Sequence, residues 1–289
     1  MEAVVREAAR GAVRESVRGP VQEPAGTVVR EPERETVRGP VREEAPTLVP
    51  SLPRRTVTYP ATTLVGPVEA QAARTPHAPA LVLAGGLTVT YGELNASANR
   101  LARALAARGA RPGTVVGLAP FRRPAELLTA LLAVVKSGAA YLPLDPADAP
   151  GRRERLLAEN APVCVLGEGV PGALAGLEVD GAPAVDPPRA LTPQHLLCVG
   201  YGPGGRPTAV RLTHAEADRR VRELQAEHPL GPGDRVLQLG LPLWEFLWPL
   251  RTGAAVVLAD PQRDGDVGAV VRELGVTAVR VAPAALLGA

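Results

Sequence analysis

Residues 125–146 read AELLTALLAVVKSGAAYLPLDP, and this stretch indicates the fold class of the chain. Its first part has the apolar spacing of a buried helix, which begins near Ala125 and ends at Gly138. Glycine is the residue that most readily takes the left-handed conformation in which helices end. A short apolar run at residues 140–142 follows and has the character of a strand. The stretch therefore predicts one helix-and-strand unit of an α/β fold.

The same alternation recurs on both sides of this unit. Further strands are predicted at residues 80–83, 87–90, 115–118, 163–166, 196–199, 235–239, 255–259 and 278–281. Further helices are predicted after Thr90, at residues 151–160, after Thr213, and at residues 243–251 and 266–274. Thr90 and Thr213 are each followed three residues later by a glutamate, which is the spacing of a capping box. Repeated strands and helices predict largely parallel sheets flanked by helices.

The first 63 residues have a different composition. The segment at residues 16–21 returns, nearly unchanged, at residues 36–41, and arginine and glutamate alternate among glycines and prolines that interrupt any long helix. The pattern predicts a low-complexity, disordered tail at residues 1–63, followed by a globular part at residues 64–289. A docking arm for an acidic partner or RNA is the alternative. Interleaved glutamates cancel most attraction to phosphate, so we expect no nucleic acid partner.

Charge and cysteine content exclude several classes of function. The formal net charge is only +2, which gives no strong field for capturing polyanions. Cys164 and Cys198 lack the spacing of a metal site, and buried thiols with no bound metal are the expectation. No run of residues has the apolar character of a signal peptide or of a membrane-spanning helix. The sequence therefore predicts a cytoplasmic protein without a membrane partner.

Three segments resemble the amino-acid adenylation domain of nonribosomal peptide synthetases, within the adenylate-forming AMP-binding superfamily. They are LTVTYGEL at residues 87–94, KSGAAYLPLDP at residues 136–146 and WEFLWPL at residues 244–250. The resemblance implies the N-terminal part of the adenylate-forming fold and a family activity of ATP-dependent amino-acid activation. We expect Lys136 to be a cation that complements the end of its helix, and Trp244 and Trp248 to be packing residues.

The phosphate-binding loop departs from the family pattern. The family's loop is rich in glycine and hydroxyl side chains and carries a lysine, whereas residues 201–214 here read YGPGGRPTAVRLTH and are two residues shorter. Thr208 stands where the family has lysine, and Pro203 removes one N–H donor. As a turn between a strand and a helix, the segment could still offer backbone amides to an anion. Gly202, Gly204, Gly205 and Thr208 are therefore the candidate residues of a vestigial phosphate loop.

The amine-binding position departs as well, since Gly240 occupies the place of the family's aspartate. A buried ammonium without a counter-charge is costly, which disfavours ordinary α-amino acids. The family would also continue beyond residue 289 with the remaining nucleotide contacts and a mobile C-terminal domain. We therefore expect a truncated homologue, inactive alone, with no catalytic residue and no cofactor. ATP and magnesium would bind only if residual activity existed.

Two other functions stay open at this point. The chain could be one component of a split amino-acid-adenylating enzyme that a partner from a peptide-synthetase system completes. It could instead be an interaction module that acts through its tail of arginine and glutamate.

Overall fold

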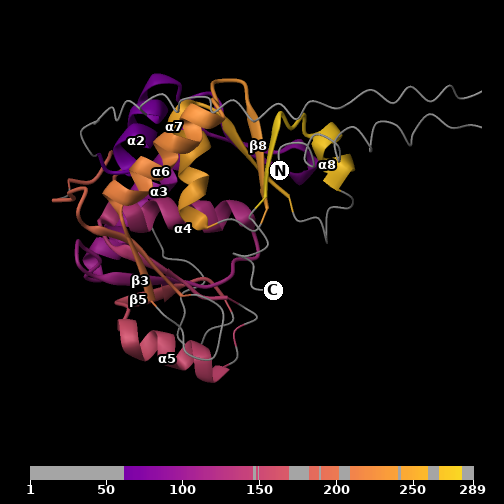
Figure 1. Ribbon diagram of the computed structural model, residues 1–289. Helices are drawn as coiled ribbons and strands as arrows, with labels where there is room; N and C mark the ends of the chain where they lie inside the picture. Colours follow the sequence, from indigo (N-terminus) through magenta and orange to yellow (C-terminus); the bar gives the residue numbers. More distant parts are fainter. Residues whose placement is uncertain are drawn as a thin grey trace, which may run out of the picture. The chain divides into compact units, whose positions relative to one another are not determined.

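The computed structural model describes residues 62–145, 148, 150–168, 182–188, 190–201, 209–239, 242–259 and 267–281. The predicted disordered tail at residues 1–63 lies almost entirely outside the described residues, so its disorder stays a prediction. The described part is a mixed α/β fold with two five-stranded sheets (Figure 1). This arrangement confirms the α/β fold class, in which largely parallel sheets are flanked by helices.

The first sheet has the strand order β10-β8-β9-β1-β2. Its strands are β1 (Pro79–Leu83), β2 (Thr88–Thr90), β8 (Arg235–Leu239), β9 (Ala255–Leu258) and β10 (Ala278–Val281). All neighbours are parallel except β1 and β2, which form a hairpin. β8 and β10 have the predicted bounds, because their short apolar runs are recognisable without knowledge of their neighbours.

The second sheet has the strand order β5-β3-β4-β6-β7. Its strands are β3 (Val115–Leu118), β4 (Ala140–Pro143), β5 (Cys164–Leu166), β6 (Leu196–Tyr201) and β7 (Ala209–Thr213). β7 is antiparallel to β6 and lies at the edge of the sheet. β7 is not predicted from the sequence, since only one of its five residues is buried and its apolar pattern is correspondingly weak.

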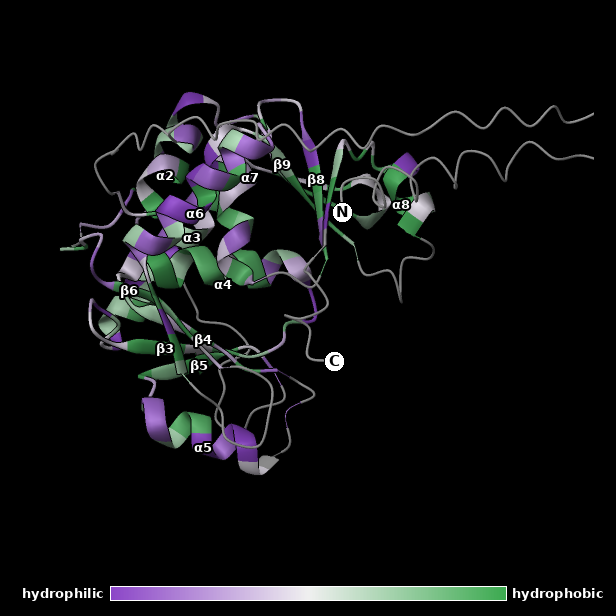
Figure 2. Ribbon diagram, in the orientation of Figure 1, coloured by the Kyte–Doolittle hydropathy of each residue, from purple (hydrophilic) through white to green (hydrophobic). Residues whose placement is uncertain are grey.

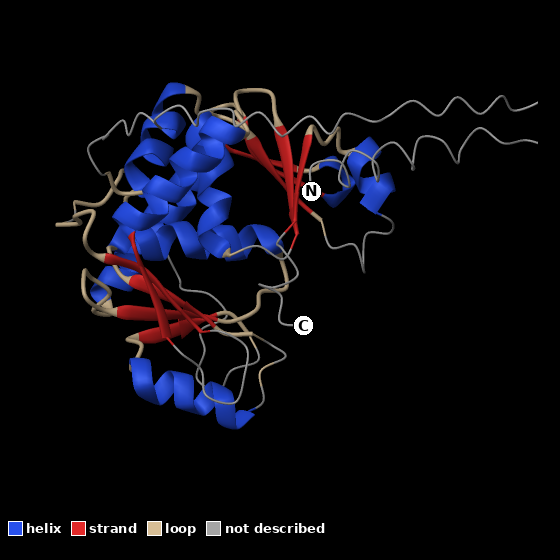
Figure 3. Ribbon diagram, viewed as in Figure 1, coloured by secondary structure: helices blue, strands red, loops and turns tan. Residues whose placement is uncertain are grey.

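Helices cover these sheets and pack against one another (Figure 3). They are α2 (Val65–Arg74), α3 (Tyr91–Ala107), α4 (Pro124–Ser137), α5 (Pro150–Asn160), α6 (His214–Glu227), α7 (Leu247–Thr252) and α8 (Val267–Glu273), with short 3-10 turns η2 (Ala84–Gly86) and η3 (Leu243–Phe246). α2 was not predicted. The predicted helix at residues 243–251 is divided between η3 and α7.

The helix ends follow the local chemistry of the sequence. Both predicted capping boxes are present: the Thr90 and Thr213 hydroxyls accept the N–H of Glu93 and Glu216, respectively, at 3.2 Å. α4 ends at Gly138, whose φ of 86° lies in the left-handed region. A side chain at this position would also meet the ring of Pro112, because an added Cβ would lie 2.8 Å from it.

The main core lies around α4, whose C-terminal two-thirds is buried. Figure 2 shows α4 as an apolar helix among more polar ones, and residues 130–137 are all buried. One cluster of buried side chains joins α2, α3 and α4 to residues of both sheets, so the two sheets share a core. No helix in the described part of the chain is long and apolar enough to cross a bilayer.

Candidate functional site

The glycine-rich segment joins two antiparallel strands. Gly202, Gly204, Gly205 and Thr208 themselves lie outside the described residues, but the strands on both sides of them are described. Tyr201 at the end of β6 is paired with Ala209 at the start of β7. The prediction that this segment leads directly into a helix was therefore wrong. β7 intervenes, and α6 begins only at His214.

Because β7 intervenes, the backbone amides of α6 do not belong to the glycine-rich segment. Backbone amides bind phosphate well when they form the first turn of a helix, because unpaired N–H groups and the helix dipole then act together. The N-terminus of α6 is already occupied by a carboxylate of the chain. Glu216 accepts hydrogen bonds from the N–H of Thr213 at 2.9 Å and from its hydroxyl at 2.8 Å. These bonds hold the pKa of the Glu216 carboxyl below its ordinary value.

A second segment of interest lies between β8 and η3. Gly240 is outside the described residues, so the structure does not test its role. On one side of it, the buried amide of Gln238 donates to the carbonyl oxygen of Glu245 at 3.2 Å. The end of β8 is thereby fastened to η3.

A carboxylate and a guanidinium pair beside this segment. Oε2 of Glu245 accepts a hydrogen bond from Nε of Arg280 at 3.2 Å, and the guanidinium also lies 5.8 Å from the centre of the Trp248 ring. Burial raises the pKa of the Glu245 carboxyl, and the charge of Arg280 opposes that rise. Glu245 therefore has a cation of the chain itself as its partner and is not a free counter-charge for a ligand ammonium.

The two tryptophans pack as predicted. Trp244 and Trp248 are both buried in the core. Nε1 of Trp248 donates to Oε1 of Gln225 on α6 at 2.7 Å, and the N–H of Trp244 donates to the hydroxyl of Tyr141 at 3.0 Å. The indole N–H of Trp248 and the backbone N–H of Trp244 thus both have acceptors within the fold.

Cys198 lies on β6 next to Tyr141, with which it also interacts, and it is buried. Burial raises the pKa of its thiol to about 11. Cys164 on β5 is only partly buried, so the expectation of two buried thiols holds for one of them. Among the described residues, no cluster of histidine, cysteine, aspartate and glutamate has the arrangement of a metal site.

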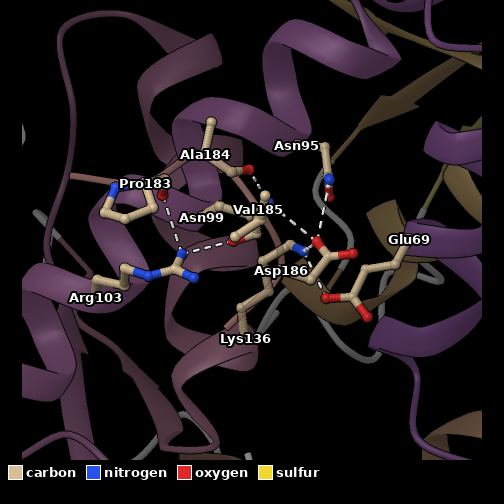
Figure 4. A network of polar contacts seen from close by, with 9 residues as sticks. All are labelled: Glu69, Asn95, Asn99, Arg103, Lys136, Pro183, Ala184, Val185 and Asp186. Carbon is tan, nitrogen blue, oxygen red and sulfur yellow. Dashed lines mark hydrogen bonds and ion pairs between the residues drawn. The ribbon is translucent and has the colours of Figure 1, made fainter. Parts of the chain in front are cut away.

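Lys136 has a different environment from the one expected. It does lie in the last turn of α4, but its side chain is fully buried and does not serve as an exposed cation at the helix end. Nζ lies 2.6 Å from Oε1 of Glu69 on α2 and 2.8 Å from Oδ1 of Asp186 (Figure 4). Neither partner is predictable from the sequence, because they are 67 and 50 residues away along the chain and no local pattern marks them.

Comparison with known proteins gives a consistent result. The family described as "AMP-binding enzyme" matches residues 68–288. Phosphinothricin tripeptide synthetase PhsB of Streptomyces viridochromogenes is 36% identical over 253 residues, which cover 78% of this chain and 21% of that protein. Tyrocidine synthase 3 of Brevibacillus parabrevis is 32% identical over 246 residues, which cover 78% of this chain and 4% of that protein.

Solved structures show the same likeness. The crystal structure of the nonribosomal peptide synthetase FmoA3 is 30% identical and has a TM-score of 0.66, covering 76% of this chain and 25% of that one. VinN in complex with L-aspartate has a TM-score of 0.64 at 20% identity, covering 76% of this chain and 66% of that one, which shows a shared fold. The chain thus spans about a fifth of PhsB and a quarter of FmoA3.

Proposed function

This chain belongs to the AMP-binding enzyme family and resembles the adenylation domains of peptide synthetases, but we propose that it does not itself activate amino acids. In this proposal it is a pseudoenzyme that keeps the scaffold of an adenylation domain. The support comes from the two places where the family would hold ATP phosphates and the substrate amine.

The phosphate site lacks donors of three kinds. Its segment has no hydroxyl side chain except that of Thr208, no lysine, and one N–H fewer because of Pro203. α6 does not replace them, because the five residues of β7 separate its N-terminus from this segment. The absence of lysine and of all but one hydroxyl side chain from residues 202–208 is the observation that carries the proposal.

The amine site lacks a counter-charge. Gly240 has no side chain to pair with an ammonium, and the neighbouring Glu245 is already paired with Arg280. Transfer of an α-amino acid to such a site would remove the ammonium from water without a compensating partner. Breaking or omitting one half of a buried ion pair typically costs about 3–5 kcal/mol.

Exchange of radiolabelled pyrophosphate into ATP tests this proposal. The full-length chain is incubated with ATP, magnesium and each of the standard amino acids, beside an active adenylation domain as a positive control. We expect no exchange above the blank without enzyme. An amino-acid-dependent signal that co-elutes with the protein on size exclusion would show that the chain is an enzyme.

A split enzyme is the second candidate, because the relatives are much longer synthetases of which this chain spans a part. A partner from a peptide-synthetase system would then supply the remaining groups. Addition of a separately expressed chain covering the rest of an adenylation domain distinguishes the two. Restored exchange supports the split enzyme, whereas continued inactivity of a stable complex supports the pseudoenzyme.

A further inference from the structure

Residues 182–188 contact two helices, α3 and α4, through polar groups (Figure 4). Asn95, Asn99 and Arg103 lie at four-residue intervals on α3 and so share one face of that helix. Nη1 of Arg103 donates to the carbonyl oxygens of residues 183 and 185, at 3.0 and 2.6 Å. Nδ2 of Asn99 donates to the carbonyl oxygen of residue 184. The face of α3 therefore binds this segment through its backbone.

The side chain of Asp186 makes most of the remaining polar contacts of the segment. Oδ1 of Asp186 accepts hydrogen bonds from Nζ of Lys136 at 2.8 Å, from Asn99 at 3.0 Å and from Asn95 at 3.1 Å. Burial alone would raise the pKa of the Asp186 carboxyl, but Lys136 and then the two asparagines more than offset this, so the pKa is lowered. The charged form of Asp186 is thus the one that fastens the segment.

Apolar burial contributes little to this contact. Val185 keeps 68% of its surface exposed, and the side chain of Asp186 keeps 44%. Buried apolar area is what normally makes a segment part of the cooperative core. A surface segment that depends on a few hydrogen bonds and one ion pair opens at a much lower free energy than the core does.

Two features limit the cost of opening. Lys136 would keep Glu69, whose Oε1 lies 2.6 Å from Nζ and whose side chain is 12% exposed, so no unpaired charge would be left in the core. The buried Oδ1 atoms of Asn95 and Asn99 have no hydrogen-bond partner within the described structure when the segment is in place. Opening would let water reach them and would recover part of the lost hydrogen bonding.

We infer that residues 182–188 form a strap that opens and closes over the amine of Lys136 while the rest of the fold stays intact, with the Asp186 carboxylate as its fastening group. Lys136 is the only lysine of the chain. The strap therefore determines whether the protein presents any reactive side-chain amine to solvent. This inference does not depend on whether the protein is an enzyme.

Acetylation with an N-hydroxysuccinimide ester tests the strap on the full-length chain. The rate at Lys136 is followed by mass spectrometry, with the α-amine of Met1 as an internal reference. We expect Asp186→Asn to raise the rate at Lys136 at least tenfold. Glu223→Gln, which removes an exposed carboxylate paired with Arg219 on α6, is the matched control and should leave the rate within about twofold.

The melting temperature separates a strap from a part of the core. It should be nearly the same for the wild type and both variants. The inference fails if Asp186→Asn leaves the labelling rate unchanged, or if faster labelling comes with an equivalent loss of global stability.

The urea dependence of Lys136 acetylation in the wild type gives an independent measurement, which decides the matter even if Asp186→Asn does not fold. Because Lys136 is fully buried when the segment is in place, its acetylation reports opening, and the rate should not depend on dilute urea. A rate that rises with urea as steeply as global unfolding does would show that the segment opens only when the whole protein unfolds.

Discussion

The hydroxyl of Tyr141 accepts a hydrogen bond from the backbone N–H of Trp244 at 3.0 Å. Tyr141 lies on β4 in one sheet, and Trp244 lies in the turn η3 that follows β8 of the other sheet. Both residues are buried, and the two positions are 103 residues apart along the chain. This bond therefore links β4 of one sheet to the turn that follows β8 of the other, and it fixes the start of η3.

Tyr141→Phe should destabilise the protein by about 1–3 kcal/mol, because the buried N–H of Trp244 would lose its acceptor. Urea denaturation measures the change. Tyr201→Phe is the matched control, since the Tyr201 hydroxyl accepts from Asn160 at 2.7 Å in a less buried position. A loss from Tyr201→Phe as large as that from Tyr141→Phe would contradict the special role of the bond between the sheets.

The free energy of unfolding of Glu245→Gln should increase relative to that of the wild type as the pH rises above the ordinary pKa of a glutamate. Burial raises the pKa of the Glu245 carboxyl in the folded state, so this carboxyl ionises at a lower pH in the unfolded chain than in the folded one. The wild type therefore loses stability as the pH rises from the ordinary pKa through the raised one. Glutamine does not titrate and escapes this loss. The difference between the two proteins in urea denaturation at several pH values measures the effect.

Arg280→Gln is the companion variant for this pair. It removes the cation that opposes the rise in the pKa of Glu245, so it should make the loss of stability with pH steeper. A pH-independent difference between wild type and Glu245→Gln would mean that Glu245 has an ordinary pKa in the folded protein.

Iodoacetamide at pH 8 should modify Cys164 well before Cys198 in the native protein. Burial raises the pKa of the Cys198 thiol to about 11, and at this pH only on the order of one thiol in a thousand would be the reactive thiolate. Cys164 is half-buried and its pKa is raised less far. Peptide mass spectrometry follows both sites. In urea the two rates should converge, whereas equal rates without urea would be incompatible with the buried position of Cys198.

The pKa values of Glu93 and Glu216 should both lie below the ordinary value, because each carboxylate accepts hydrogen bonds from the N–H and hydroxyl of its capping threonine. The stability that each cap contributes is present above the ordinary pKa and is lost as the pH falls through the lowered one. Carboxyl NMR measures both values. Thr90→Val should return only Glu93 toward its ordinary pKa, and Thr213→Val only Glu216. A shift of both glutamates by one substitution would show that the caps are not independent.

Local sequence signals predicted most of the elements but few of their contacts. The capping boxes and the left-handed Gly138 were predictable because a helix end depends on residues three or four positions apart. β3, β8 and β10 were predictable from short apolar runs. The order of strands was not, since pairing depends on residues that are distant in the sequence.

The environment of the candidate site was the least predictable part. β7 has an exposed, weakly apolar sequence, and without it the loop at residues 202–208 was placed directly before a helix. The partners of Lys136 are far away along the chain. Gly202, Gly204, Gly205, Thr208 and Gly240 remain predictions of the sequence, since they lie outside the described residues.

The pairing of β6 with β7 has a consequence for engineering. Its register runs from Leu196 opposite Thr213 to Tyr201 opposite Ala209 and includes five pairs of residues within the strands. Hairpin stems of this kind tolerate insertions at their tips, because each doubling of loop length adds only about 0.6 kcal/mol of closure entropy. A longer, lysine-bearing loop could therefore be transplanted between Tyr201 and Ala209 without displacing α6, and the scaffold would accept a graft of the missing anion cradle.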